Sequence, residues 1–150
     1  MKYIVTGGAG FIGSNIVKKL VARGDEVIVI DNLNTGKEEN LISVKDKIVF
    51  LNDSILNLDL LEKQTQNIDG VFHQAALASV QDSFTKPDEY KNVNVNGTEN
   101  ILKLAEKNNF KVVYASSSSV YGNPMRIPIK ETDEKNPINP YAETKLKKEE

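Results

Sequence analysis

The stretch Thr6-Gly7-Gly8-Ala9-Gly10-Phe11-Ile12-Gly13 follows a run of apolar residues and opens a segment of helical periodicity. Glycines at this spacing permit a tight turn from strand to helix and let the backbone approach a pyrophosphate, which then lies at the positive end of the helix. The next apolar run ends at Asp31, 18 residues after Gly13, where a carboxylate can accept hydrogen bonds from a ribose. This context predicts a dinucleotide-binding unit.

The acidic residue at the end of that run also predicts which dinucleotide is bound. A carboxylate at Asp31 repels the 2′-phosphate of NADP, and no arginine lies near it in the sequence. Lys37 is the one nearby cation that opposes this preference. We therefore expect NAD as the cofactor. The competing interpretation, a merely glycine-rich turn beside a solvent-exposed acid, leaves the agreement of position and spacing unexplained.

Short apolar runs alternate with helical segments along the rest of the chain. The runs are nearly continuous in apolar residues, as strands covered on both faces of a parallel sheet are. We expect strands at Lys2–Thr6, Glu26–Asp31, Lys47–Asn52, Gly70–Gln74 and Lys111–Ser116. We expect helices at Phe11–Arg23, Asn57–Gln66 and Pro87–Asn108, the first with an apolar stripe of Ile12, Ile16, Val17, Leu20 and Val21. This alternation predicts an α/β fold, a Rossmann-type doubly wound parallel sheet.

Composition argues against several classes of function. The 150 residues include no cysteine and a single histidine, His73, which excludes disulfides and argues against a metal centre or a His-based triad. The 19 Lys and Arg against 21 Asp and Glu give a net charge of −2, which argues against nucleic acid as a partner. No apolar stretch is long enough for a signal sequence or membrane span, so we expect no membrane association and a cytoplasmic location.

A second group of polar residues follows the fifth predicted strand. It contains the serines of Ser116–Ser119 and, 24 residues beyond Ser117, the pair Tyr141 and Lys145. The preceding Asn-Pro is typical of an N-cap and first helical position, which places Tyr141 and Lys145 on one helix face. An ammonium fixed beside a phenol favours the phenolate, so Tyr141 is a candidate general base. A serine hydroxyl at the strand end is a candidate for holding the reacting oxygen.

With these residues the chain resembles the extended short-chain dehydrogenases/reductases, specifically their nucleotide-sugar epimerase branch. The resemblance covers the whole chain. It rests on Thr6–Gly13, Asp31-Asn-Leu33, His73-Gln-Ala-Ala76, Asn94-Val-Asn-Gly-Thr98, Ser116-Ser-Ser-Ser-Val-Tyr-Gly122 and Tyr141-Ala-Glu-Thr-Lys145. It implies NAD-dependent epimerisation at C4 of a UDP-hexose such as UDP-glucose or UDP-N-acetylglucosamine, through a transient 4-keto sugar.

The resemblance implies a role for each matching residue. Tyr141 is the base, Lys145 tunes it and binds the nicotinamide ribose, and Ser117 is the catalytic serine, or Ser118 if the register slips by one. The implied cofactor residues are Gly7, Gly10, Phe11, Ile12 and Gly13 at the pyrophosphate, Asp31, Asn32, Asn34, Thr35 and Gly36 at the adenosine ribose, and Ala75, Ala76 and Leu77 near the nicotinamide, with Asn94 behind them. His73 is implied to be a structural residue near the cofactor.

Two positions depart from the family's pattern. Family members commonly carry an Asp-Ile pair that contacts adenine after the third strand, whereas this chain has Asp53-Ser54-Ile55, so Ser54 and Ile55 stand at that place. Ala78 stands where some UDP-glucose epimerases have a lysine. The stretch His73–Ser83 is instead similar to epimerases that accept N-acetylated UDP-sugars.

Several alternatives stay open. Dehydratases of this family place an Asp-Glu pair after the catalytic threonine, and this chain has Ser118 and Ser119 there, so dehydration lacks its acid and base. A UDP-sugar decarboxylase is a further rival, and a UDP-glucuronate epimerase is compatible with the serine run. A rival of another class is a non-catalytic NAD-binding module, for which the glycine turn and Asp31 suffice.

The length of the chain affects what it can do alone. Family members are about twice as long, so we expect residues 1–150 to be an NAD-binding domain, cut short before the C-terminal substrate lobe and inactive by itself. The resemblance also implies a homodimer of the full-length protein, with the helix at Pro87–Asn108 and the helix of Tyr141 packing across the two-fold axis.

Overall fold

The computed structural model describes residues 1–150, which divide into two compact units. The first contains Met1–Ala75 and Gly97–Ala115, and the second contains Ala76–Asn96 and Ser116–Glu150. No helix in the chain combines the length and the apolar character needed to cross a membrane.

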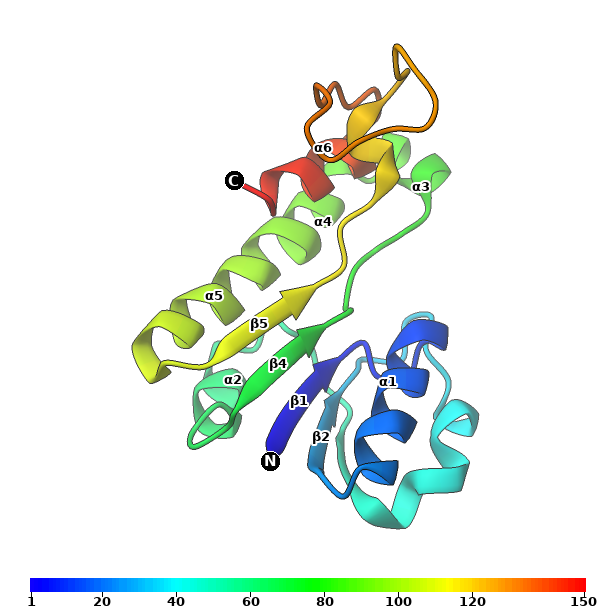
Figure 1. Ribbon diagram of the computed structural model, residues 1–150. Coiled ribbons are helices and arrows are strands. Elements are labelled where there is room, and N and C mark those ends of the chain that lie inside the picture. The colour runs from blue at the N-terminus through cyan, green and yellow to red at the C-terminus, as the bar shows by residue number, and fades with distance from the viewer. The chain divides into compact units, whose positions relative to one another are not determined.

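Five parallel strands form the sheet of the first unit. They are β1 (Lys2–Thr6), β2 (Glu26–Ile30), β3 (Ile48–Leu51), β4 (Gly70–His73) and β5 (Lys111–Tyr114), in the order β3-β2-β1-β4-β5. The register pairs Thr6 with Ile30 on one side and with His73 on the other. The labelled arrows in Figure 1 point the same way, so the carboxyl ends of β1, β2 and β4 meet at one edge. This is the predicted Rossmann-type parallel sheet.

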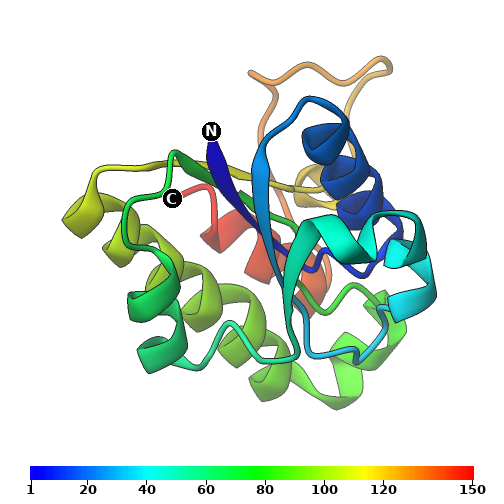
Figure 2. The same cartoon turned by 90° about the horizontal axis from the view of Figure 1, so that it is seen from below.

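Helices cover both faces of this sheet. They are α1 (Phe11–Ala22), the 3₁₀ segment η1 (Glu38–Lys47), α2 (Leu58–Gln64) and α5 (Gly97–Asn108). Because right-handed crossovers run outward from β1 in both directions, α1 and η1 lie on one face and α2 and α5 on the other. In Figure 2, α1 and η1 (blue and cyan) lie on one side and α5 (yellow-green) on the other.

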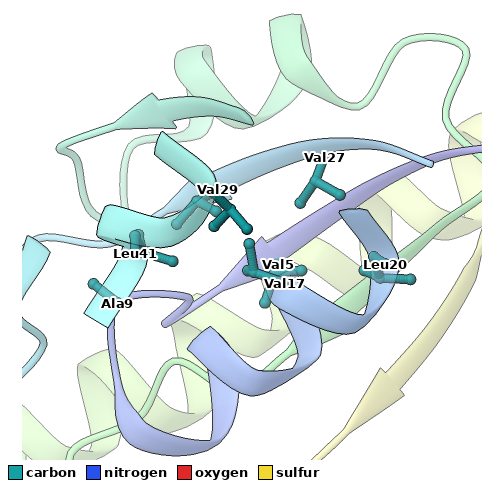
Figure 3. Close-up of a cluster of buried hydrophobic side chains, with 8 residues drawn as sticks. Val5, Ala9, Val17, Leu20, Val27, Val29 and Leu41 are labelled. Atoms are coloured by element: carbon teal, nitrogen blue, oxygen red, sulfur yellow. The ribbon is translucent and has the colours of Figure 1, made fainter. Parts of the chain in front are cut away.

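The core under α1 is built from small branched side chains. Val17 and Leu20 of α1 pack against Val5 of β1 and against Val27 and Val29 of β2, as Figure 3 shows. Leu41 and Val44 of η1 and Ala9 of the glycine turn complete the cluster. Burying such side chains is the main term that holds a helix onto a sheet, at roughly 1.5–3 kcal/mol for each fully buried Val or Leu.

The predicted elements need several corrections. The second to fifth strands each end one or two residues earlier than predicted, and β3 also begins one residue later. The first helix ends one residue earlier than predicted, at Ala22. The second helix is shorter at both ends, with Asn57 as its N-cap and Thr65 as its C-cap. The helix predicted at Pro87–Asn108 consists of α4 (Pro87–Tyr90), a π-helical segment η2 (Lys91–Asn96) and α5. Ile12 is 60% exposed, because the close packing of α1 on the glycine turn runs through Gly13 rather than Ile12.

The second unit is assembled around a short helix near the end of the chain. Its elements are α3 (Val80–Thr85), α4, η2, the 3₁₀ turn η3 (Ser118–Tyr121) and α6 (Pro140–Lys147), and the first four all contact α6. The buried Tyr90 donates its hydroxyl to the carbonyl of Ser79 at 2.7 Å, which ties α4 to the start of α3. As predicted, α6 begins with Asn139 as its N-cap and Pro140 as its first residue.

Candidate functional site

The turn from β1 to α1 has no room for side chains at two of its glycines. Gly7 has a φ of +66°, and a Cβ there would lie 2.6 Å from the backbone nitrogen of Ala75. A Cβ on Gly13 would overlap the carbonyl oxygen of Gly7. The N–H of Gly10 donates to that same carbonyl at 3.1 Å. Only glycine lets these backbone segments approach so closely.

The first turn of α1 leaves its backbone N–H groups available to an anion. Its N-cap residue, Gly10, makes no side-chain capping hydrogen bond, and the first turn contains no acidic residue. Phe11 and Ile12, which begin the helix, are 84% and 60% exposed. Uncapped N–H groups at the positive end of a helix bind phosphate groups. We call the backbone of Gly7, Gly10, Phe11, Ile12 and Gly13 the glycine cradle. The glycine cradle fits a pyrophosphate, which these residues would hold.

Backbone groups on two sides hold the carboxylate of Asp31. One oxygen accepts the N–H of Ala9 and the other accepts the N–H of Leu33, both at 2.9 Å. A Cβ on Gly36 would lie 2.9 Å from both oxygens, so only a residue without a side chain fits there. Each carboxylate oxygen can accept a further hydrogen bond, so Asp31 keeps capacity for a ribose hydroxyl. The other predicted ribose residues lie exposed in the loop after β2 and are Asn32, Asn34 and Thr35.

The segment predicted to contact adenine uses its side chains internally. The Oγ of Ser54 accepts the N–H of Leu56 at 3.2 Å, which closes the turn after β3. The side chain of Ile55 is 4% exposed and packs against Gly97, and its carbonyl accepts a hydrogen bond from Asn100 at 3.3 Å. The side chain of Ile55 therefore belongs to the core, and any adenine contact at this residue falls to its backbone.

In the second unit a buried amide clamps the segment that follows Ala76. Asn94, 0% exposed, accepts the N–H of Leu77 at 2.8 Å and donates to the carbonyl of Leu77 at 3.0 Å. The same Nδ2 donates to the hydroxyl of Thr144 at 3.0 Å, and Thr144 donates to the carbonyl of Tyr141 at 2.7 Å. Asn94 thus fixes Leu77 to the helix that carries Tyr141.

The Tyr-Lys pair lies on one face of α6. The Oδ1 of Asn139 accepts the N–H of Ala142 at 2.8 Å and fixes the start of the helix. The Nζ of Lys145 lies 5.7 Å from the centre of the Tyr141 ring, within cation–π range. Lys145 is 4% exposed, and this burial lowers the pKa of its ammonium. The lysine therefore places a poorly hydrated positive charge beside the phenol.

The serine run contacts the same helix through η3. The half-buried Ser117 is the N-cap of η3, and its Oγ accepts hydrogen bonds from the N–H and the hydroxyl of Ser119. Ser118 is exposed. Of the two candidate serines, Ser117 is the one whose side chain these hydrogen bonds hold in place, which favours it over Ser118.

Three side chains have roles that the sequence did not predict. Ser119 and Thr144 act through neighbouring polar groups, and a hydroxyl in such a role carries no signal in the sequence. Lys148 is only 7% exposed, and burial beside the positive Lys145 lowers its pKa to about 7. Its spacing of three residues from Lys145, on the same helix face, is the one signal that could have pointed to it.

The predicted residues divide between the two units. Those from Gly7 to Ala75 belong to the first unit, whereas Ala76, Leu77, Asn94, Ser117, Ser118, Tyr141 and Lys145 belong to the second. The first unit therefore holds the predicted pyrophosphate and ribose contacts, and the second holds the predicted proton-transfer groups.

Comparison with known proteins links both groups to one family. Residues 3–150 match the NAD dependent epimerase/dehydratase family. The chain is 43% identical to the UDP-glucose 4-epimerase of Halalkalibacterium halodurans over 149 residues, which cover 97% of this chain and 43% of that protein. It is 41% identical to UDP-glucuronic acid decarboxylase 1 of Arabidopsis thaliana over 143 residues, which cover 95% of this chain and 32% of that protein.

A solved structure shows the same fold. The UDP-N-acetylglucosamine 4-epimerase from Methanobrevibacter ruminantium M1, in complex with UDP-N-acetylmuramic acid, matches with a TM-score of 0.93 at 39% identity. The match covers 99% of this chain and 48% of that chain, so this chain spans less than half the length of each relative named here. The family uses NAD, and the glycine cradle and Asp31 fit that cofactor. From the family match and the fold together, the chain belongs to the NAD dependent epimerase/dehydratase family.

Proposed function

We propose that this chain is the NAD-binding domain of a nucleotide-sugar 4-epimerase that acts on a UDP-hexose. The observation that carries the proposal is the buried Lys145 ammonium beside the Tyr141 ring, on a helix against which the Ser117 turn packs. Together with a hydride acceptor such as NAD, a phenol, a fixed cation and an oriented hydroxyl are the groups needed to oxidise an alcohol and reduce the ketone again. The 4-epimerases among the relatives support this type of reaction.

In the proposed reaction each side chain acts on the 4-hydroxyl of the sugar. Tyr141 takes the proton of this hydroxyl, and Lys145 favours the phenolate form that accepts it. Ser117 donates a hydrogen bond to the same oxygen and stabilises it as it becomes a carbonyl. NAD, when bound, would supply the acceptor for the hydride of C4 and the donor for its return. After the transient 4-keto sugar has rotated to present its opposite face, Tyr141 gives the proton back.

We assign each part of the cofactor to the residues that the resemblance to the family implies. We assign the pyrophosphate to the glycine cradle, the adenosine ribose to Asp31 and the loop through Gly36, and the adenine to Ser54 and the backbone of Ile55. Ala75, Ala76, Leu77 and Asn94 are assigned to the nicotinamide side, and Lys145 to its ribose. Residues outside this chain, which make up more than half of each relative, would hold the UDP-sugar.

A decarboxylase is the second candidate, because the Arabidopsis relative carries that name. Decarboxylation and epimerisation share oxidation at C4, so the same tyrosine, lysine and serine serve both. A UDP-glucuronate epimerase is a third variant of the same chemistry. Dehydration is disfavoured, since Ser118 and Ser119 stand where it needs an acid and a base. A non-catalytic NAD-binding module would give Tyr141 and Lys145 no catalytic role.

The test is turnover by the native-length protein that carries this chain. The protein is incubated with UDP-glucose, UDP-N-acetylglucosamine or UDP-glucuronate without added NAD, and products are followed by NMR. A C4 epimer supports the proposal, release of CO₂ and a UDP-pentose indicates the decarboxylase, and no turnover with NAD bound indicates the binding module.

A pair of tyrosine variants tests the role of the base. Tyr141→Phe should abolish turnover and leave NAD binding unchanged. Tyr3→Phe, the same change on β1, where the hydroxyl lies 3.1 Å from the Sδ of Met1, is the matched control and should turn over normally. Equal activity of the two variants would remove Tyr141 from the mechanism.

The remaining assignments concern the whole protein. We propose that the protein is a cytoplasmic homodimer and that residues 1–150 alone do not epimerise. Light scattering of the native-length protein tests the dimer, and the NMR assay on residues 1–150 tests the second statement.

A further inference from the structure

A buried row of three polar side chains lies beneath the end of β1. The ring of His73 joins two hydroxyls: its Nδ1 lies 2.7 Å from the Oγ1 of Thr6, and its Nε2 lies 2.9 Å from the Oγ1 of Thr98. All three residues are at most 2% exposed. Thr6 is the last residue of β1, and Thr98 lies in the first turn of α5. The imidazole is therefore fixed at both nitrogens, by groups on two different elements.

The two ends of this row lie on different elements, Thr6 beside the glycine turn and Thr98 on α5. The Oγ1 of Thr6 also accepts the N–H of Ala75 at 3.3 Å. The backbone of Ala75 is the group that a Cβ on Gly7 would strike. Thr6 thus contacts Ala75, and Ala75 contacts Gly7. Gly7 is the first residue of the proposed glycine cradle. The other end of the row lies on α5, which contains none of the residues assigned to the cofactor.

The hydrogen-bonding capacity of the groups explains how His73 controls Thr6. A hydroxyl has one proton and two lone pairs, and it can rotate freely when nothing fixes it. In either tautomer of His73, the hydrogen bond to Nδ1 restricts the rotation of the Thr6 hydroxyl and leaves a lone pair for the N–H of Ala75. Without the ring, the hydroxyl rotates and the 3.3 Å bond to Ala75 loses its acceptor geometry.

We propose that His73 is a positioning residue for the dinucleotide, which fixes the Thr6 hydroxyl and through it holds Ala75 and the glycine turn in the geometry that binds the pyrophosphate. The inference rests on the proposed NAD binding and extends it to a residue that does not touch the cofactor. It differs from a packing role, in which His73 fills space and both of its hydroxyl partners matter equally.

The matched test is Thr6→Val against Thr98→Val in the protein that carries this chain. Both changes replace a hydroxyl by a methyl group of similar size, both sites are buried, and both remove one partner of His73. We expect the Kd for NAD, measured by calorimetry, to rise about tenfold in Thr6→Val and to stay within about twofold in Thr98→Val. Both variants should unfold at a lower temperature.

A second pair keeps the test decisive if a valine variant fails to fold. The amide of His73→Asn reaches the place of Nδ1, whereas the amide of His73→Gln reaches toward that of Nε2. The Asn variant should bind NAD within about threefold of wild type and the Gln variant about tenfold more weakly. Thr6→Ser, which keeps the hydroxyl, should bind as wild type does.

Two results would overturn the inference. One is an unchanged Kd in a folded Thr6→Val variant, and the other is equal weakening by the two valine changes or by the two His73 changes. A wild-type protein that does not bind NAD would instead overturn the proposed function, and this inference with it.

Discussion

Ser119 donates two hydrogen bonds to the Oγ of Ser117, one from its hydroxyl at 2.8 Å and one from its backbone N–H at 3.2 Å. A hydroxyl oxygen has two lone pairs, so both acceptor positions of Ser117 are occupied. What Ser117 keeps is its own proton. The neighbouring serine thus leaves Ser117 free to act as a hydrogen-bond donor. In the proposed reaction the 4-oxygen of the sugar needs such a donor as it becomes a carbonyl.

Removal of the Ser119 hydroxyl should therefore slow the proposed reaction of the native-length protein. We expect Ser119→Ala to lower kcat about tenfold with little change in KM, because Ser117 loses its orientation. Ser119→Thr keeps the hydroxyl and should retain most of the activity. In a Ser117→Ala background the Ser119→Ala change should have no further effect. Additive losses in this cycle would show that the two serines act separately.

Gly13→Ala should damage the cofactor cradle directly. The added methyl group overlaps the carbonyl oxygen of Gly7, so the turn has to move. We expect a loss of about 1–3 kcal/mol of stability and at least a tenfold rise in the Kd for NAD. Gly70→Ala is the control, because its Cβ meets the Lys111 carbonyl at 3.0 Å at the other end of β4. It should destabilise the protein with NAD affinity retained, and equal NAD affinities of the two variants would contradict the cradle.

The charge of Asp31 should determine the preference for NAD over NADP. We expect Asp31→Asn to weaken NAD binding and to narrow the ratio of NADP to NAD Kd values by roughly tenfold, because repulsion of the 2′-phosphate is lost. Asp25→Asn is the matched control just before β2, where Asp25 pairs with Arg23 and the N-terminus. Titration of each variant with both dinucleotides measures the ratio, and an unchanged ratio in Asp31→Asn would refute this role.

Asn94→Asp should be strongly destabilising at neutral pH. The Nδ2 of Asn94 donates to the carbonyl of Leu77 and to the hydroxyl of Thr144, and a carboxylate cannot donate. With 0% exposure, the new charge is buried, and we expect a loss of about 3 kcal/mol or more. Asn96→Asp, on an exposed residue of the same π-helical segment, should cost less than about 0.5 kcal/mol. Chemical denaturation checks both, and a small loss at residue 94 would contradict the clamp.

Lys148 should make stability rise with pH. Its folded pKa of about 7 lies below that of an unfolded lysine, so between pH 7 and 9 the unfolded chain holds a proton that the folded chain has released. Stability therefore increases over this window, by about 2 kcal/mol for this group. Lys148→Met should be more stable than wild type at pH 7 and should lose most of this pH dependence. Lys147→Met, at an exposed neighbour paired with Glu150, should keep the wild-type slope. Parallel slopes for all three proteins would show that Lys148 titrates normally.

Much of the fold could be predicted from the sequence, because its signals are local. The strands are found from β-branched runs, and the glycine turn, the Asn139-Pro140 cap and the Tyr141–Lys145 pair each depend on neighbours in sequence. The segment Glu38–Lys47 has only Leu41 and Val44 as buried apolar residues, so its pattern was too weak to predict a helix. The π-helical turn at Lys91–Asn96 leaves no mark on hydrophobic periodicity. Ser119, Thr144 and Lys148 depend on contacts that form only after folding.

The strand order β3-β2-β1-β4-β5 has a consequence for which substitutions the cradle tolerates. The chain reverses its winding direction at β1, so the connections that leave β1 and β4 turn to opposite faces of the sheet. In parallel sheets wound in this way, nucleotides bind at the point where the winding reverses, a position set by chain connectivity rather than by any side chain. Exchange of core residues at constant volume should leave this connectivity in place. Substitution of Gly7 or Gly13, where backbone segments meet, should disturb the turn. We therefore expect related sequences to vary in their core side chains and to keep glycine at these two positions.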